Sequence, residues 1–256
     1  MKPHRPSPAA HGGDFPQTRH TLLSLIRSDE TGARRRGIDQ LVAAYWKPVY
    51  KYVRLRWHES PHDAEDLTQG FFSQAIQATL FDDYDPSRGR FRTYLRTCVD
   101  RFVLNARAYA NRARRGGGAD HLPLDFTTAE GELHELPLPS SQDPETLFRD
   151  EWVRRLFELA IADLGEHCAA AGKELSFRLF ERYDLDPPES HESRVTYDTL
   201  AAEFGVSTTQ VTNLLADARR RFRAALMERV RQSTASDAEF REELMDLLGF
   251  GPGDAR

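Results

Sequence analysis

The chain has 256 residues, of which 39% are hydrophobic and 29% are charged, a composition typical of a globular protein rather than a disordered one. No apolar run approaches the roughly 20 residues that cross a bilayer. The first residues, rich in proline and charge, lack the apolar core of a secretory signal. The two cysteines, Cys98 and Cys168, fall within predicted helices, so we expect free thiols and no metal site. These features favour a cytoplasmic protein without a membrane partner.

The formal net charge of −5 argues at first against binding to nucleic acid, but the charges are unevenly distributed. Residues 86–115 contain nine arginines and one acid, Asp100, whereas residues 116–145 contain seven acids and no lysine or arginine. Adjacent blocks of opposite charge predict a basic binding face followed by an acidic connector. Either block alone is also compatible with a solvated surface.

Apolar residues recur with helical periodicity through the first part of the chain, and no segment predicts a strand. One helix is predicted around residues 38–53, and Pro48 is expected to kink or split it. A second helix begins at Ser60, which can cap it and is followed by a proline suited to the first turn. A third helix covers residues 91–109. Together these helices predict one compact unit over residues 15–115.

The stretch that follows is rich in proline, glycine, serine and acids, and it predicts an acidic flexible linker. Helices are predicted again from Asp143 onward and over residues 174–183. The expected fold class is therefore all-α, with two small helical domains joined by the linker. The expected order along the chain is a disordered N-terminus at 1–14, a first domain at 15–115, the linker at 116–142, a second domain at 143–232, and a C-terminal amphipathic helix and tail at 233–256.

Residues 197–215 have the spacing of a helix-turn-helix motif. A short helix is predicted to end at Gly205, because glycine readily adopts the left-handed conformation of a tight turn. Ser207 and Gln210 have the spacing of a capping box, which would start a second helix placed for the major groove of DNA. An ordinary helical hairpin is the alternative. The arginines between 219 and 223 favour DNA, because they can contact backbone phosphates.

Several segments together resemble the extracytoplasmic-function RNA polymerase sigma factors of the sigma-70 family. Residues 63–72 resemble region 2.2, which binds the large subunit of the polymerase. Residues 85–95 and the arginine-rich helix to Arg115 resemble the regions that melt and recognise the −10 promoter element. Residues 197–226 resemble region 4, which recognises the −35 element. Residues 15–19, 115–118 and 238–248 further resemble a planctomycete-type subgroup, and the whole resemblance covers about residues 15–248.

The resemblance implies a sigma factor that binds core RNA polymerase and directs promoter recognition and melting at the start of DNA-templated transcription. It implies no enzymatic activity, no cofactor and no bound metal. The implied partners are core RNA polymerase and promoter DNA, and an anti-sigma factor or another regulator is a further candidate. The first domain corresponds to sigma region 2 and the second to the helix-turn-helix of region 4.

The resemblance also implies site residues. Contacts to core polymerase are expected at Asp63, Glu65, Asp66 and Gln69, although acids in a first turn also complement the helix dipole. Contacts to the −10 element are expected at Arg90, Phe91, Arg92, Tyr94, Arg101, Asn105, Arg107 and Arg112. Contacts to the −35 element are expected at Ser207, Thr208, Thr209, Gln210, Thr212, Asn213, Arg219 and Arg220. Phe91 and Tyr94 suit stacking on an unpaired base, and packing in the core is their alternative role.

Two other functions stay open from the sequence. A stand-alone helix-turn-helix transcriptional regulator would explain residues 197–215 but not the acidic segment 63–72. A metal-dependent nuclease would require residues 82–87 to bind a metal, but the calcium-loop pattern fails because Tyr94 stands where glutamate is needed. The linker also has three interpretations: a spacer, an RNA mimic in a basic channel of the polymerase, or a restraint on the arginine-rich helix.

Overall fold

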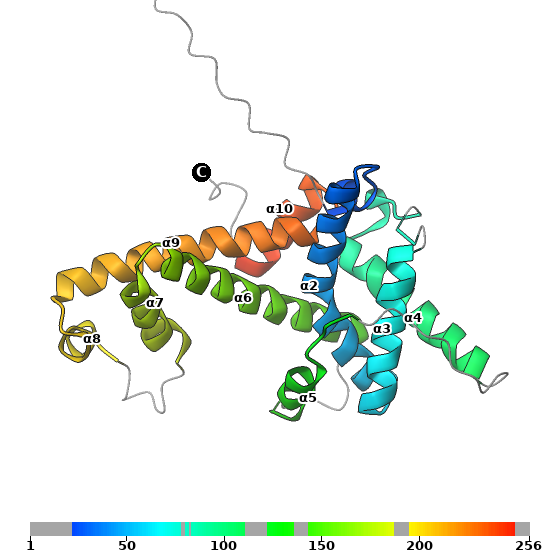
Figure 1. Ribbon diagram of the computed structural model, residues 1–256, viewed down its shortest axis with the longest axis horizontal. Coiled ribbons are helices and arrows are strands. Elements are labelled where there is room, and N and C mark those ends of the chain that lie inside the picture. Colours follow the sequence, from blue (N-terminus) through cyan, green and yellow to red (C-terminus); the bar gives the residue numbers. More distant parts are fainter. Residues whose placement is uncertain are drawn as a thin grey trace, which may run out of the picture.

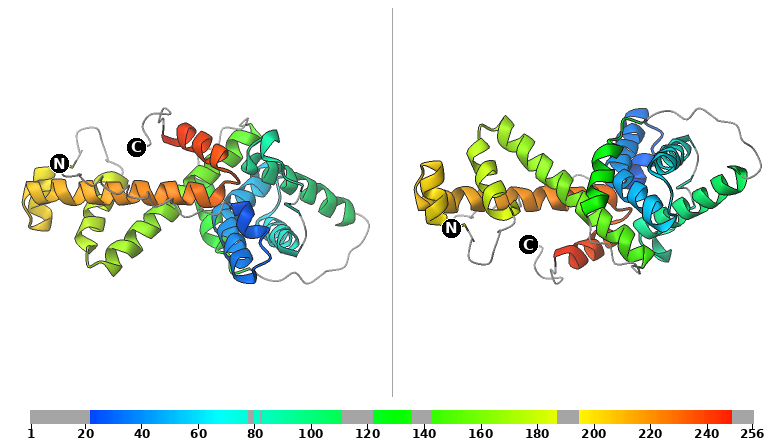
Figure 2. Two further views of the ribbon diagram at one scale, coloured as in Figure 1. Left: turned by 90° about the horizontal axis from the view of Figure 1, so that it is seen from above. Right: turned by 90° about the horizontal axis from the view of Figure 1, so that it is seen from below.

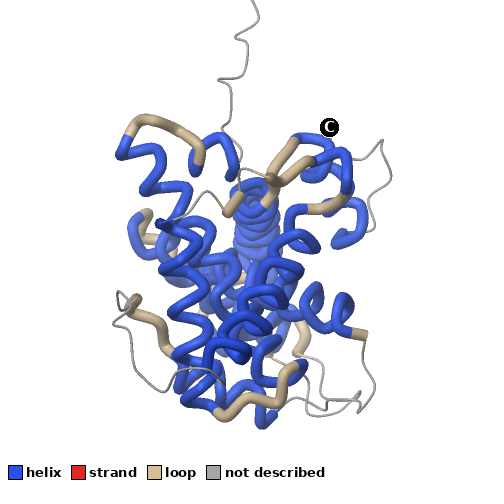
Figure 3. Tube along the Cα trace, turned by 90° about the vertical axis from the view of Figure 1, so that its right-hand side faces the viewer, coloured by secondary structure: helices blue, strands red, loops and turns tan. Residues whose placement is uncertain are grey.

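The computed structural model describes residues 22–77, 80–81, 83–110, 122–135, 143–186 and 195–248, and these residues form helices and turns but no strand (Figure 3). The helices are α1 (Leu22–Ile26), α2 (Thr31–Arg56), α3 (Pro61–Gln77), α4 (Phe91–Ala110), α5 (Phe126–Glu135), α6 (Pro144–Ala170), α7 (Glu174–Phe180), α8 (Tyr197–Phe204), α9 (Thr208–Ser233) and α10 (Asp237–Leu248), with a 3₁₀ turn η1 (Pro86–Arg88) and a π-helical turn η2 (Glu181–Leu185). The predicted all-α fold is confirmed. None of these helices combines the length and the apolar character that membrane crossing requires.

Helix starts follow the capping signals of the sequence. The Ser60 hydroxyl accepts a hydrogen bond from the Asp63 amide at 3.1 Å before α3, and the Asp143 carboxylate accepts one from the Thr146 amide at 3.0 Å before α6. Pro48 does not split α2, which continues through it to Arg56. A proline inside a helix removes one backbone hydrogen bond, and here its neighbours on α2 are buried in the core, which offsets that loss.

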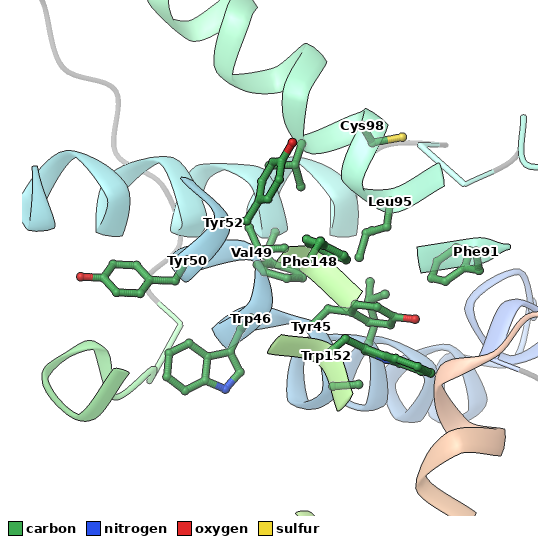
Figure 4. Close-up of a cluster of buried hydrophobic side chains, with 14 of the residues drawn as sticks. Tyr45, Trp46, Val49, Tyr50, Tyr52, Phe91, Leu95, Cys98, Phe148 and Trp152 are labelled. Carbon is green, nitrogen blue, oxygen red and sulfur yellow. The ribbon is translucent and has the colours of Figure 1, made fainter. Parts of the chain in front are cut away.

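The largest buried cluster surrounds α2, which packs against α1, α3, α5 and α6. Tyr45 stacks on Phe148 and Trp152 of α6 with 6.4 Å between ring centroids in both pairs. Tyr52 meets Phe148 edge to face at 5.5 Å (Figure 4). Because aromatic rings bury large apolar areas, these contacts make α6 part of the same core as α2 and α4.

Helices α6 and α9 lie side by side, run in opposite directions, and extend from the α2–α4 bundle to α7 and α8 (Figures 1 and 2). Phe157 of α6 contacts Phe222 of α9 with 5.8 Å between the rings. Beyond this contact, a second and smaller core forms from Leu164, Cys168, Leu179, Phe180, Leu200, Val211, Leu215 and Ala218. Both α6 and α9, which fall in the second predicted domain, therefore contribute residues to both cores. Cys98 and Cys168 are buried free thiols, as predicted.

Part of the predicted linker is a packed helix. Helix α5 contributes Phe126, whose ring contacts Trp46 at 5.6 Å and Tyr50 at 5.1 Å on α2. The Asp125 carboxylate accepts a hydrogen bond from the Thr128 amide at 3.1 Å and caps the helix. The prediction of a flexible linker is thus wrong for residues 126–135. The acids and prolines of residues 116–142 favour a linker, but Phe126, Ala129 and Leu133 recur at helical spacing and are buried.

If the linker restrained the arginine-rich helix, its acids would pair with α4. Two acids of α5 pair with α2 instead. Glu132 forms ion pairs with Lys47 and with Lys51 at 2.7 Å, and Glu130 pairs with Arg54. All three bases belong to α2. These two acids of the linker therefore connect α5 to α2.

Among the residues that the structure describes, the most deeply buried ion pair lies between α2 and α6. Only 1% of the Lys51 side chain and 4% of the Glu151 side chain are exposed, and the Lys51 Nζ lies 2.8 Å from a carboxylate oxygen of Glu151. Arg154 contacts the same carboxylate from the solvent side. Breaking such a pair from one side leaves an uncompensated charge in a medium of low polarity, which is costly.

We predict that Lys51→Met lowers the free energy of unfolding by about 3–5 kcal/mol, because the buried Glu151 carboxylate then loses its buried ammonium partner and keeps only the more exposed Arg154. Urea denaturation followed by circular dichroism measures this change. Arg149→Met is the matched control, because it removes an exposed pair with Asp150 on the same helix and should cost less than about 1 kcal/mol. Equal losses in the two variants would contradict the buried-pair explanation.

Candidate nucleic-acid interface

The turn before α4 contains Gly89 between Arg88 and Arg90. The Asp85 carboxylate caps η1 by accepting hydrogen bonds from the Ser87 amide at 2.9 Å and the Ser87 hydroxyl at 2.7 Å. Gly89 has φ +144°, a conformation that other residues rarely adopt, and its carbonyl accepts a hydrogen bond from the Tyr84 hydroxyl at 2.8 Å. Asp85 thus has a capping role within the segment that the nuclease hypothesis assigned to a metal. Among the described residues there is no group of three His, Cys, Asp or Glu side chains that could hold a metal.

Two neighbouring hollows open on the surface of α4. The first has a volume of about 360 Å³ and lies between the η1 turn and α4; its lining includes Arg88, Arg90, Thr93, Thr97 and Arg101. The second lies between α3 and α4, and its lining includes Phe71, Gln74, Cys98, Phe102 and Asn105. Asp83, Tyr94 and Arg101 line both hollows. The structure therefore brings together four of the predicted DNA contacts, namely Arg90, Tyr94, Arg101 and Asn105.

Tyr94 stands between the two hollows. Its hydroxyl donates a hydrogen bond to the Leu80 carbonyl at 2.9 Å, and its ring contacts Tyr84 with 5.2 Å between centroids. Burial raises the pKa of Tyr94 to about 12, so the hydroxyl stays protonated and the ring stays neutral near physiological pH. Arg101 is exposed and lines both hollows. The anchored Tyr94 ring can therefore stack on a base, and the Arg101 guanidinium can bind a phosphate beside it.

Phe91 and Arg92 do not belong to this surface. Phe91 is completely buried, and its ring contacts Tyr45, Phe81 and Tyr84 at centroid distances of 5.3–5.9 Å. The Phe91 ring is therefore packed in the core, its alternative role, and is not accessible for stacking in this structure.

The Arg92 side chain is 7% exposed, with its Nε 2.7 Å from Glu243 and its Nη1 3.1 Å from Glu145. Its guanidinium also lies over the Trp152 ring, 5.8 Å from the centroid. Because a buried guanidinium needs such partners, the predicted DNA contact of Arg92 is replaced by a role in packing.

Arg107, another predicted DNA contact, already has partners within the chain. The Arg107 Nε lies 2.7 Å from Glu59, its Nη2 donates to the Trp57 carbonyl at 2.6 Å, and its guanidinium covers the Trp57 ring. Arg107 is thus half-exposed but already engaged. Arg112 lies outside the described residues.

The acidic start of α3 is on the surface. Asp63 and Asp66 are exposed and Glu65 is half-buried, so these acids are accessible to a partner. Gln69 is different, because only 6% of it is exposed. Its amide donates to the Leu122 carbonyl and accepts from the Leu122 amide, both at 2.8 Å. Gln69, predicted as a polymerase contact, thus holds the segment that leads into α5.

The two helices and the turn predicted for residues 197–215 are present. Gly205 ends α8 with φ +66°, and the side chains of Ser207 and Gln210 form a reciprocal capping box at the start of α9. The Thr208 hydroxyl donates to Asp198 of α8 at 3.0 Å, which ties the two helices together. The predicted residues at the start of α9 are exposed, namely Thr208, Thr209, Gln210, Thr212 and Asn213.

The arginines farther along α9 are paired. Arg219 contacts the Asp184 carboxylate at 2.8 Å and lies over the Tyr183 ring, 5.2 Å from the centroid. Arg220 pairs with Asp217 but keeps 70% of its side chain exposed. Hydrogen bonds from Arg221 and Lys173 hold the pKa of the Asp217 carboxyl well below its usual range, so this acid stays ionised. Of the two predicted arginines, Arg220 is therefore the more accessible.

The acids that surround the start of α4 were not anticipated from the sequence. Glu145 of α6 lies 2.8 Å from the Arg96 Nε and accepts a hydrogen bond from the Thr93 hydroxyl at 2.6 Å. From α10, the Glu239 carboxylate accepts hydrogen bonds from the backbone amides of Phe91 at 2.6 Å and Ala235 at 2.8 Å. The available signal was a face of acids on α10 at positions 239, 242, 243 and 246, which share one side of a helix.

Residues 41–113 match the family model described as sigma-70 region 2. The matched segment contains most of α2, all of α3 and α4, and the two hollows on α4. The match makes this part of the chain similar to sigma-70 region 2. No curated protein and no solved structure matches the chain.

The position of Glu239 generates a prediction about pH. Burial raises the pKa of Glu239 from its ordinary value of 4.5 to about 7, with Glu243 adding repulsion while the Phe91 and Ala235 amides and Arg92 oppose the shift. The folded state therefore binds this proton more tightly than the unfolded state does. The resulting stabilisation is complete below about pH 4.5 and is lost as the pH rises through about 7.

We expect the melting temperature to fall between about pH 5 and pH 8, and the fall to be smaller in Glu239→Gln. Differential scanning fluorimetry across this range measures the difference in slope. Glu166→Gln, an exposed acid on α6, is the control and should keep the parent slope. A parent-like slope in Glu239→Gln would show that Glu239 is not the titrating group.

Proposed function

We propose that this chain is a sigma factor that binds core RNA polymerase and directs promoter recognition and melting in transcription initiation. The observation that carries this proposal is the coincidence of the sigma-70 region 2 match with the two hollows on α4. The proposal includes the extracytoplasmic-function type and its planctomycete-type subgroup, which rest on the sequence segments that resemble them. It also implies work in the cytoplasm, where the polymerase is found.

In this proposal, α4 binds the separated strand of the −10 element. Tyr94 offers a ring whose hydroxyl is anchored on Leu80, and Arg90 and Arg101 border the same hollow. Asn105 borders the second hollow and has an amide that can hydrogen-bond a base edge. Stacking and phosphate contacts need bases that are out of the duplex, which fits a protein that melts DNA. Phe91 and Arg92 serve this site indirectly, since they fix the start of α4 in the core.

Core polymerase is the partner proposed for the start of α3. Asp63 and Asp66 are three residues apart, so they share one side of the helix. The Asp63 carboxylate accepts a hydrogen bond from the Ser60 hydroxyl at 2.6 Å, while Asp66 lies 3.8 Å from His62 at the surface. Neither interaction buries the acids, so a basic surface of a partner can approach them.

The start of α9 is proposed to recognise the −35 element. The capping box fixes the first turn, and Thr209, Thr212 and Asn213 are exposed in the first two turns. A helix that enters the major groove makes its base contacts from residues near its N-terminus. Gln210 and Ser207 are partly committed to the capping box, which leaves Asn213 as the side chain best able to hydrogen-bond a base.

A stand-alone helix-turn-helix regulator is the second candidate function, and the geometry of α8 and α9 favours it. The two functions differ in their dependence on polymerase. A regulator binds a duplex site by itself, whereas a sigma factor requires core polymerase for promoter-specific binding and for opening of the DNA. An anti-sigma factor or another regulator remains a proposed partner.

We expect the double charge reversal Asp63→Arg and Asp66→Arg to weaken binding to core polymerase by about tenfold to a hundredfold, because repulsion replaces attraction at the interface. Surface plasmon resonance with immobilised core polymerase measures the affinity, and circular dichroism verifies the helical content.

The matched control for this charge reversal is Asp39→Arg with Glu166→Arg, which makes the same change in net charge at exposed acids of α2 and α6. The control should bind nearly as the parent does. Equal losses in both double variants would mean that binding depends on net charge alone and not on the start of α3.

For α9, we expect Thr209→Ala with Asn213→Ala to reduce discrimination among −35 sequences by about 1–3 kcal/mol, since base contacts are lost. The measurement is transcription from a set of promoter variants with core polymerase present. Gln210→Ala should instead lower the stability of the fold by about 0.5–2 kcal/mol through loss of the capping box. A uniform decrease across all promoters for the first variant would assign Thr209 and Asn213 to phosphate contact or folding.

A further inference from the structure

Helix α10 folds back from the end of α9 and packs against the α2–α4 bundle (Figures 1 and 2). Phe240 and Leu244 are buried in the main core, and the Arg231 guanidinium covers the Phe240 ring at 3.9 Å from its centroid. These apolar contacts hold the helix in place independently of its charges. Helix α10 carries five acids and one base, so its placement brings a strongly negative segment to the bundle.

That negative segment lies on the arginines at the start of α4. Glu243 is buried, with its side chain 2% exposed, and it contacts the Nε of Arg92 at 2.7 Å and the Nη1 of Arg90 at 3.2 Å. Glu242 lies 3.6 Å from the Arg90 Nε, and Asp246 also contacts Arg90. The side chains of Glu242 and Asp246 remain 58% and 48% exposed. Arg90 thus meets three carboxylates of α10, two of which face solvent.

The same guanidinium borders the first hollow on α4. Arg90 lines it together with Arg88, Tyr94 and Arg101. A guanidinium has a fixed set of N–H donors, so donors that bind carboxylates are not available to a phosphate. A phosphate that binds the Nε and Nη1 donors of Arg90 must therefore displace Glu242 and Asp246.

We propose that α10 is an intramolecular competitor of nucleic acid, which masks Arg90 with Glu242 and Asp246 and weakens binding of the free protein to a phosphate backbone. This inference rests on the proposed function, because it concerns regulation of the same α4 site. Glu239 and Glu243 act differently from the competing pair, since they are buried and hold the first turn of α4. Exposed ion pairs exchange readily with other partners, so the outer two acids can yield to phosphate while the helix stays packed.

The test is the double variant Glu242→Gln with Asp246→Asn, which keeps side-chain size and removes the two exposed charges. The full-length protein is titrated into a fluorescently labelled single-stranded DNA of about 16 nucleotides and mixed sequence, and anisotropy is recorded. Affinity should rise about threefold to tenfold at low salt, and the gain should shrink as salt increases, because exposed charges are screened.

The matched control is Asp237→Asn with Glu166→Gln. Asp237 is on the same helix, but its partner is Arg231 of α9, and Glu166 is exposed on α6. This control removes the same formal charge away from Arg90, so its affinity should change little. A second arm repeats the double variant Glu242→Gln with Asp246→Asn in an Arg90→Ala background, where the gain in affinity for DNA should disappear.

The competitor role is overturned if the test variant binds no more tightly than the control variant, or if its gain persists without Arg90. Failure of the proposed function would look different. In that case the parent protein would neither bind core polymerase nor support initiation, whatever the behaviour of the α10 variants. If the parent supports initiation and the α10 variants bind DNA as the control does, only the inference about α10 fails.

Discussion

The first turn of α4 is held by carboxylates from two other helices, and the arrangement of the candidate site depends on this contact. Glu145 of α6 pairs with Arg92 and Arg96, while Glu243 of α10 closes the other side of Arg92. The Glu239 carboxylate accepts a hydrogen bond from the backbone amide of Phe91, which would otherwise lack a partner at the helix start. Buried arginines and unpaired amides are both costly, so the acids constrain where α4 can lie.

This constraint divides the arginine-rich helix into two parts with different roles. The part before Asp100 is fixed to the bundle through Phe91, Arg92 and Arg96, and the Arg96 Nη1 pairs with Asp100 itself at 3.0 Å. Beyond Asp100, Arg101 and Asn105 face the hollows from the exposed side of the helix. The start of α4 is thus fixed, while its later part is accessible. Tyr94 and Arg101 are therefore positioned before binding, which avoids the loss of conformational entropy that ordering them on binding would cost.

Much of the fold was predictable because its signals are local. The caps at Ser60, Asp143 and Ser207 and the glycine at Gly205 determine helix ends from a few neighbouring residues, and the structure places helix ends there.

The errors concern contacts between distant segments, which periodicity does not encode. Phe91 and Arg92 are in a basic run and suggested DNA contacts, but the acids that bury Arg92 are more than 50 residues away in Glu145 and Glu243. Acids and prolines around α5 favour a linker, and only three apolar residues have helical spacing there. These three residues are buried because they pack against α2, a contact between distant segments.

The central claim, that this chain is a sigma factor, is tested most directly by run-off transcription with purified core RNA polymerase of its own host on genomic fragments. Transcripts from discrete start sites are expected only when both the chain and the core enzyme are present. Core polymerase alone and the chain alone should each give none of these transcripts. If the same fragments give identical products with and without the chain, while the chain binds duplex DNA by itself, the sigma-factor account is contradicted.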